Sequence, residues 1–192
     1  LLLGKDKMKR LRHAHVLVVG LGGVGAYAAE MICRAGVGRM TIVDADIVQP
    51  SNINRQLSAL YSTMGRPKGG NFWSERFRDI NPDLELTVLV EYLKDERIPE
   101  LLDSAKFDFV VDAIDTVAPK CYLIYNVLQR RLPIVSSMGP VLNGILLRFV
   151  CRFMGYLPLR IKQSRAEAFA ENGDEAENFR LYLVQSRPIR MR

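Results

Sequence analysis

A glycine-rich turn directly after a short apolar run constrains the fold of this chain most. Residues 15–20 are apolar and β-branched, which predicts a buried parallel strand. The spacing G-x-G-x-x-G follows at once, and helical periodicity begins at residue 23. Such a unit is typical of nucleotide binding, because the helix N-terminus attracts a phosphate. We therefore expect a nucleotide at this turn, held by Gly20, Gly22, Gly23 and Gly25; the alternative is a turn that serves packing alone.

Strand-like and helix-like segments alternate along the chain up to residue 139. Further strands are predicted over 40–44, 84–92, 107–111 and 133–137, and helices over 23–35, 68–80, 95–104 and 116–131. Gly69 and Gly70 disfavour a helix at the start of 68–80. This alternation predicts an α/β fold with a Rossmann-like, doubly wound, mainly parallel sheet and helices on both faces. Periodicity weakens afterwards: 141–156 fits a helix or a strand pair, and 180–184 fits one more strand.

Composition restricts the class of protein. Hydrophobic residues make up 48% and charged residues 25% of the chain, as in ordinary globular proteins. Arg148 and Arg152 interrupt the longest apolar stretch, so we expect no membrane partner. The three cysteines form no Cys-x-x-Cys pair, which argues against structural zinc and a disulfide framework and suits a cytoplasmic location. The net charge of +6 favours a polyanion such as nucleic acid; the alternative is a solvated charged surface.

Polar side chains follow the second predicted strand. Asp44 ends that strand about 20 residues after the glycine turn, where a carboxylate accepts ribose hydroxyls; the alternative is a loop cap. A cluster of Asn52, Arg55, Gln56 and Lys68 comes next. Transfer of a nucleotidyl group builds negative charge that Arg and Lys stabilise, whereas hydride transfer requires no such pair. Taken singly, each cation would more often be solvated.

Two acids follow the fourth predicted strand. Asp112 and Asp115 lie where the carboxyl edge of such a sheet binds ligands. A carboxylate beside phosphates requires a cation between them, so Asp115 is our candidate Mg²⁺ ligand. The alternative is that Asp115 caps the helix from Thr116.

The motifs GLGGVG, DADIVQPSNINRQ, GRPK and VVDAID, in this order, resemble the adenylating fold of the ubiquitin-activating-like (ThiF/MoeB) superfamily. Within it, the chain is most similar to the branch of bacterial tRNA threonylcarbamoyladenosine dehydratases, over residues 2–139. The resemblance implies ATP and Mg²⁺ as cofactors. It also implies that Gly22 and its neighbours hold the phosphates and Asp44 the ribose. Arg55, Lys68 and Asp115 would be catalytic, with Asn52, Arg55 and Lys68 on the triphosphate and Asp115 on Mg²⁺.

The resemblance implies an ATP-dependent tRNA-modifying enzyme. Such an enzyme activates the threonylcarbamoyl carboxylate on a tRNA adenosine and closes a ring with net loss of water. A tRNA substrate, a homodimer and a sulfur-relay partner are the expected partners. Two alternatives stay open: adenylation of the C-terminus of a sulfur-carrier or ubiquitin-like protein, and a nucleotide-binding module without catalysis. A NAD-dependent oxidoreductase is the weakest alternative.

The resemblance and the periodicity both end near residue 139. We therefore expect an ATP-binding adenylating domain over residues 1–139 and a divergent or frameshifted tail over 140–192. Because the sequence begins with Leu1 rather than methionine, we also expect the natural start to lie upstream.

Overall fold

A six-stranded parallel sheet forms the centre of the molecule. The computed structural model describes residues 4–138 and 181–185. The strand order is β3-β2-β1-β4-β5-β6, and every neighbouring pair runs parallel. The strands are β1 His15–Val19, β2 Arg39–Val43, β3 Glu85–Leu89, β4 Phe109–Asp112, β5 Ile134–Met138 and β6 Leu181–Gln185. This arrangement confirms the predicted α/β class and the doubly wound sheet.

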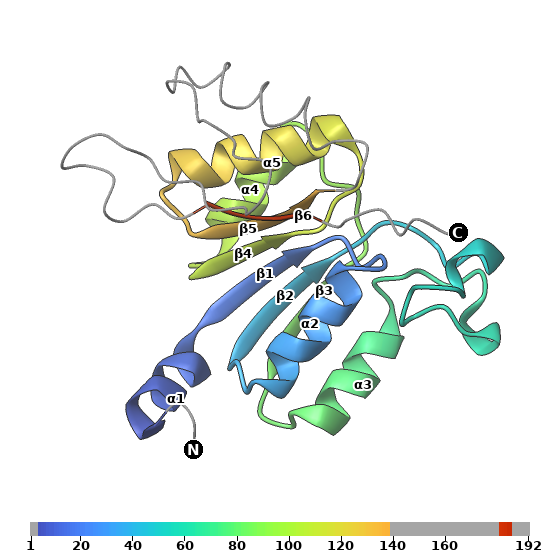
Figure 1. Ribbon diagram of the computed structural model, residues 1–192, viewed down its shortest axis with the longest axis horizontal. Coiled ribbons are helices and arrows are strands. Elements are labelled where there is room, and N and C mark those ends of the chain that lie inside the picture. Colours follow the sequence, from blue (N-terminus) through green and yellow to red (C-terminus); the bar gives the residue numbers. More distant parts are fainter. Residues whose placement is uncertain (1–3, 139–180, 186–192) are drawn as a thin grey trace.

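Helices cover both faces of the sheet (Figure 1). Helices α2 (Gly25–Arg34) and α3 (Asn71–Ile80) lie on one face, and α4 (Arg97–Ser104) and α5 (Val117–Gln129) lie on the other. The first helix, α1 (Gly4–His13), lies beyond the amino end of β1. Two short 3-10 helices, η1 (Pro50–Asn52) and η2 (Tyr61–Thr63), interrupt the long loop between β2 and α3. No helix among residues 4–138 is long and apolar enough to span a membrane.

Strand β1 divides the core into two layers, because its side chains alternate between the faces of the sheet. Val16 and Val18 belong to the core under α2 and α3, which includes Trp73 and Phe77. The remaining core, under α4 and α5, contains the buried side chains of Leu17, Val19, Val43, Leu93, Ile98, Leu101, Leu102, Phe107, Val110, Leu123, Ile124, Val127 and Ile134. Burial on both faces explains why β1 is apolar from Val16 to Val19.

The strand order fixes where a ligand can bind. The chain runs outward from β1 to β2 and β3 and then returns through α4 to β4, on the other side of β1. The loops after β1 and β4 therefore diverge to opposite faces of the sheet. Ligands of doubly wound sheets bind at this switch point, outside the carboxyl ends of the strands.

The structure departs from the sequence-based prediction at two helices and agrees with it at the last strand. The predicted helix 68–80 begins only at Asn71, because Gly70 takes an extended conformation as its N-cap residue; Lys68 therefore belongs to the loop. Helix α1 was not predicted, since none of its residues is buried and only Met8 and Leu11 are apolar. The strand predicted over 180–184 is confirmed as β6. The segment 141–156 lies outside the described residues, and the domain boundary at 139 stays a prediction.

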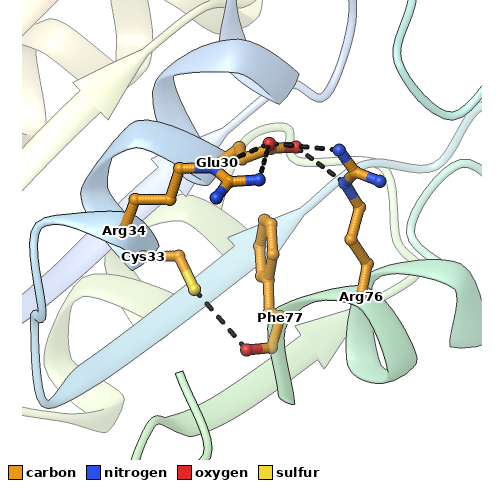
Figure 2. Close-up of polar contacts among 5 residues, drawn as sticks. All are labelled: Glu30, Cys33, Arg34, Arg76 and Phe77. Atoms are coloured by element: carbon orange, nitrogen blue, oxygen red, sulfur yellow. Dashed lines mark hydrogen bonds and ion pairs between the residues drawn. The ribbon is translucent and has the colours of Figure 1, made fainter. Parts of the chain in front are cut away.

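Buried Glu30 joins α2 to α3 (Figure 2). Its Oε1 accepts hydrogen bonds from Arg34 (Nε 3.0 Å, Nη2 2.8 Å), and its Oε2 accepts one from Arg76 Nε at 2.7 Å. Cys33 Sγ also approaches the carbonyl oxygen of Phe77, at 3.6 Å. These contacts hold the two helices together on one face of the sheet.

Replacing Glu30 by glutamine is expected to lower the free energy of unfolding by about 2 kcal/mol at pH 7, because charge-assisted bonds to a buried carboxylate are lost. The hydrogen bonds from Arg76 lower the pKa of Glu30 below its ordinary value of 4.5. The stabilisation is therefore fully present above pH 4.5 and is lost as the pH falls through the lower folded pKa. Urea unfolding at pH 7 and pH 3, with exposed Glu75→Gln as the control, checks this. An equal loss at both pH values would contradict it.

Candidate nucleotide-binding site

The glycine turn after β1 has a separate packing requirement at each glycine. Gly20 has a φ of +89°, and a Cβ there would lie 2.7 Å from the carbonyl oxygen of Ala113. At Gly25 a Cβ would lie 1.8 Å from the carbonyl oxygen of Gly20. Gly22 differs: among the described residues a Cβ would approach only Gln56 Nε2, at 3.8 Å. The turn is thus closed where strand and helix meet and open at its second glycine, the position at which turns of this type admit a phosphate.

These environments predict opposite effects for two alanine substitutions. Gly25→Ala is expected to destabilise the protein by more than the ~1–3 kcal/mol typical of overpacking, because backbone atoms would have to shift. Gly22→Ala is expected to leave the unfolding temperature unchanged and to weaken ATP binding, because the methyl group would occupy the phosphate's space. Thermal unfolding and calorimetric titration with ATP measure both effects. Unchanged affinity in folded Gly22→Ala would place the phosphate elsewhere.

Asp44 follows the end of β2 and ties the glycine turn to the next loop. Its Oδ2 accepts a hydrogen bond from the Leu21 amide at 2.6 Å, and its Oδ1 accepts one from the Asp46 amide at 2.8 Å. Burial raises the pKa of Asp44, against the lowering effect of these amide donors. The Asp44 carboxylate therefore fixes the backbone of the glycine turn through Leu21, and its remaining lone pairs are available to ribose hydroxyls. The cap role and the ribose role are compatible, and the ribose role stays a prediction.

Lys68 lies beside Asp44 on a segment pinned to the loop after β2. Its backbone amide donates to the Asp46 carbonyl at 2.7 Å, and its carbonyl accepts from Trp73 Nε1 at 2.7 Å. The side chain of Lys68 is buried, and its Nζ pairs with Asp46 Oδ2 at 2.8 Å. Asp46 itself is largely exposed, with 66% of its side-chain surface accessible. The Lys68 ammonium is thus held near Asp44 by Asp46, whose exposed carboxylate can rotate into solvent.

The polar cluster 52–56 packs over the glycine turn. The aliphatic part of the Arg55 side chain lies against Gly23, since a Cβ on Gly23 would lie 3.4 Å from Arg55 Cγ. The Arg55 guanidinium is exposed and donates to the carbonyl of Ser51 at 3.0 Å. Asn52 is buried, and its side-chain oxygen accepts from the Gln49 amide at 3.0 Å. Asn52 therefore shapes the η1 turn that carries Arg55, and contact of either residue with a triphosphate stays a prediction.

Gln56 belongs to the predicted polar cluster, although no role was assigned to it. Its side chain is buried beside Gly22, and its Oε1 has no hydrogen-bond partner among the described residues. A buried acceptor without a donor is costly, so such an atom indicates a missing ligand or water. The residues at the turn therefore fit a nucleotide, whose ribose hydroxyls are hydrogen-bond donors.

Asp112 and Asp115, both predicted at the carboxyl end of β4, occupy different environments. Asp112 is fully buried and pairs with the equally buried Lys120, which the sequence analysis did not identify. The signal for Lys120 was its helical alignment with Leu123, Ile124 and Val127 in an apolar stripe.

Asp115 is exposed in the loop before α5, in keeping with a group that meets a ligand. As to the alternative that Asp115 caps this helix, the N-cap residue of α5 is Thr116, and no side-chain hydrogen bond caps its start. Among residues 4–138 no cluster of three or more His, Cys, Asp or Glu side chains could hold a metal. A single carboxylate fits Mg²⁺ when substrate phosphates supply the other ligands.

With this geometry established, comparison with known proteins assigns the family. A family model described as the ThiF family matches residues 1–173. The chain belongs to the ThiF family. It is 42% identical over 139 residues to the tRNA threonylcarbamoyladenosine dehydratase of Bacillus subtilis (strain 168), covering 72% of this chain and 54% of that protein. It is also 34% identical over 143 residues to the molybdopterin-synthase adenylyltransferase of Escherichia coli (strain K12), covering 72% of this chain and 55% of that one.

A solved structure of the ThiF-family fold supports the same relation. The crystal structure of the Escherichia coli tRNA N6-threonylcarbamoyladenosine dehydratase, TcdA, in complex with ATP matches with a TM-score of 0.67 and 37% identity. The match covers 71% of this chain and 55% of that one. This chain thus spans about half the length of the relatives that it matches.

Proposed function

We propose that this protein is an ATP-dependent enzyme that activates the threonylcarbamoyl carboxylate of a tRNA adenosine and cyclises it with net loss of water. One observation carries the proposal: the glycine turn is open at Gly22, and Asp44 links this turn to the loop that holds the buried Lys68 ammonium. The aliphatic part of the Arg55 side chain packs against the same turn. A cation pair beside a phosphate site suits nucleotidyl transfer. The similarity to a dehydratase solved with ATP supports the same substrate.

In the proposed reaction, some residues of the site bind ATP and others stabilise the charge that develops. The turn and the N-terminus of α2 bind the phosphates, and Asp44 accepts the ribose hydroxyls. A carboxylate oxygen of the substrate attacks the α-phosphorus, pyrophosphate leaves, and Arg55 and Lys68 stabilise the developing charge. A nitrogen of the same group then attacks the activated carbon and releases its proton to solvent, and AMP leaves with that oxygen. Asp115 would hold Mg²⁺, which neutralises phosphate charge.

A tRNA substrate accords with the distribution of charge. The net charge is +6, and α1 presents exposed basic side chains from Lys5, Lys7, Lys9, Arg10 and Arg12. Contacts between cations and phosphates supply much of the affinity for nucleic acid and make it dependent on salt. We therefore expect tRNA binding to weaken steeply with added salt.

Exchange of pyrophosphate into ATP tests the proposed function. We expect exchange with tRNA that bears threonylcarbamoyladenosine and none with unmodified tRNA. Exchange that requires a carrier protein instead would favour the adenylyltransferase reading, for which the similarity to molybdopterin-synthase adenylyltransferase is the supporting observation. Binding of ATP without exchange under either condition would identify a nucleotide-binding module.

A homodimer is part of the proposal, on the evidence of α2. Val24, Tyr27 and Met31 follow one another at helical spacing and are 49%, 48% and 54% exposed. An apolar stripe of this kind on a helix beside a ligand site suits contact with a second copy.

The free thiols of Cys33 and Cys121 suit a reducing compartment such as the cytoplasm, and a sulfur-relay partner stays a prediction.

Introducing charge into this stripe is expected to separate the dimer. Tyr27→Glu with Met31→Glu should weaken self-association by about 100-fold, because unpaired charges would be buried at the contact. Sedimentation velocity across a concentration series measures the effect, and Tyr27→Phe with Met31→Leu is the matched control. Undiminished association of the charged variant would place the interface elsewhere.

A further inference from the structure

A fully buried lysine lies beneath the loop that carries the candidate metal ligand. The side chains of Lys120 and Asp112 each have no exposed surface. The Lys120 ammonium donates to Asp112 Oδ2, to Ser136 Oγ at 3.1 Å and to the Ser137 carbonyl at 3.0 Å. An ammonium has three donors, so this one is completely satisfied. It joins α5 to the carboxyl ends of β4 and β5.

The other oxygen of Asp112 reaches into the next loop. Asp112 Oδ1 accepts a hydrogen bond from the Ile114 amide at 3.0 Å, one residue before Asp115. The Ala113 amide donates to the Val19 carbonyl at 2.8 Å, and the Ala113 carbonyl would lie 2.7 Å from a Cβ on Gly20. Residues 113 and 114 are therefore held between the buried ion pair and the glycine turn.

Stability alone gives a weak reason for such a pair. Removing two charges from water is costly, and well-packed apolar side chains of similar volume often stabilise a fold as well or better. Burial raises the pKa of Asp112, against the lowering effect of the Lys120 ammonium. Without Lys120, the Asp112 carboxylate would therefore take up a proton, and the hydrogen bond that it accepts from the Ile114 amide would weaken.

We propose that Lys120 is a positioning residue: through Asp112 it fixes the 113–116 loop and thereby the placement of Asp115 against the triphosphate and Mg²⁺. This inference rests on the proposed function. Lys120 itself is too deeply buried to touch a substrate. Its effect is on geometry, and a misplacement of about 1 Å at a reacting centre can cost about 100-fold in rate.

The test uses an apolar triple variant of the full chain, Asp112→Leu with Lys120→Met and Ser136→Ala. It removes the charges together and leaves none of them buried alone, so it is expected to fold. Two quantities are measured: amide hydrogen exchange of residues 113–116, and the enhancement of ATP affinity by Mg²⁺. Glu30→Gln is the matched control, because it weakens a buried ion-pair cluster away from this loop. If the triple variant fails to fold, Ser136→Ala alone serves, since it removes one hydroxyl.

We expect exchange of the 113–116 amides to be about tenfold faster in the triple variant, because the Ile114 amide loses its acceptor. ATP affinity without Mg²⁺ should be retained and its enhancement by Mg²⁺ lost. Glu30→Gln should change neither quantity. A folded variant with undiminished Mg²⁺ enhancement would overturn the proposal, whether or not its exchange is faster. If the unmodified protein shows no Mg²⁺ enhancement, the metal assignment of the proposed function fails, and unchanged exchange would separately refute the positioning role.

Discussion

Replacement of Asp115 by alanine is expected to reduce Mg²⁺-dependent pyrophosphate exchange by at least about 1,000-fold, because a metal at transferring phosphates contributes several kcal/mol of charge stabilisation. The side chain is exposed in the loop after β4, so its loss should leave the unfolding temperature unchanged. Initial rates at saturating ATP, measured over a series of Mg²⁺ concentrations, give the comparison.

A matched exposed acid controls for general effects of charge. Asp83 is exposed and precedes β3, at the amino ends of the strands rather than at the carboxyl ends where the site lies. Asp83→Ala should therefore exchange pyrophosphate as the unmodified protein does. Undiminished exchange in Asp115→Ala would remove the metal assignment, and an equal loss in Asp83→Ala would show that the effect is not specific to the site.

Replacement of Lys68 by methionine is expected to reduce exchange by about 100-fold to 1,000-fold, the usual cost of removing one preorganised donor from a developing charge. The fold should tolerate the change. Methionine fills the buried space without a desolvated charge, and exposed Asp46 can be solvated after it loses Lys68. The loss should fall mainly on kcat, since the ammonium acts most strongly on charge that develops during the transfer.

Arg66 offers a control within the same four-residue segment. It is exposed, and Arg66→Met should change exchange by no more than about twofold, as is usual for surface substitutions. Equal effects of Lys68→Met and Arg66→Met would indicate that the segment contributes general positive charge. A rise in KM alone would assign Lys68 to ground-state binding.

The backbone plan of the site was accessible from the sequence because it depends on local rules. The spacing of Gly20, Gly22 and Gly25 after an apolar strand predicted the turn, and the structure shows the steric reason at the first and third positions. The alternation of strands and helices predicted the order of elements. The place of Asp44 followed from the length of one βα unit.

Other features depend on contacts that no local pattern encodes. Lys120 aligns with the apolar stripe of α5, but the partners of its ammonium group are evident only once β4 and β5 lie against that helix. Lys68 pairs with Asp46, 22 residues away in the sequence, whereas the Arg55 guanidinium donates to Ser51 and Asn54 within its own loop. Helix α1 was not predicted because its only apolar side chains, Met8 and Leu11, make a short stripe among basic residues. The place of β6 beside β5 also depends on pairing over a long sequence separation.

A crystal structure with Mg²⁺ and a non-hydrolysable ATP analogue tests the central claim most directly. We expect the triphosphate over Gly22, the Lys68 ammonium moved from Asp46 to a phosphate oxygen, the Arg55 guanidinium turned from Ser51 to the phosphates, and Asp115 on the metal. A bound nucleotide that leaves Lys68 on Asp46, with Arg55 and Asp115 directed away from the phosphates, would contradict the assignment of an adenylating site.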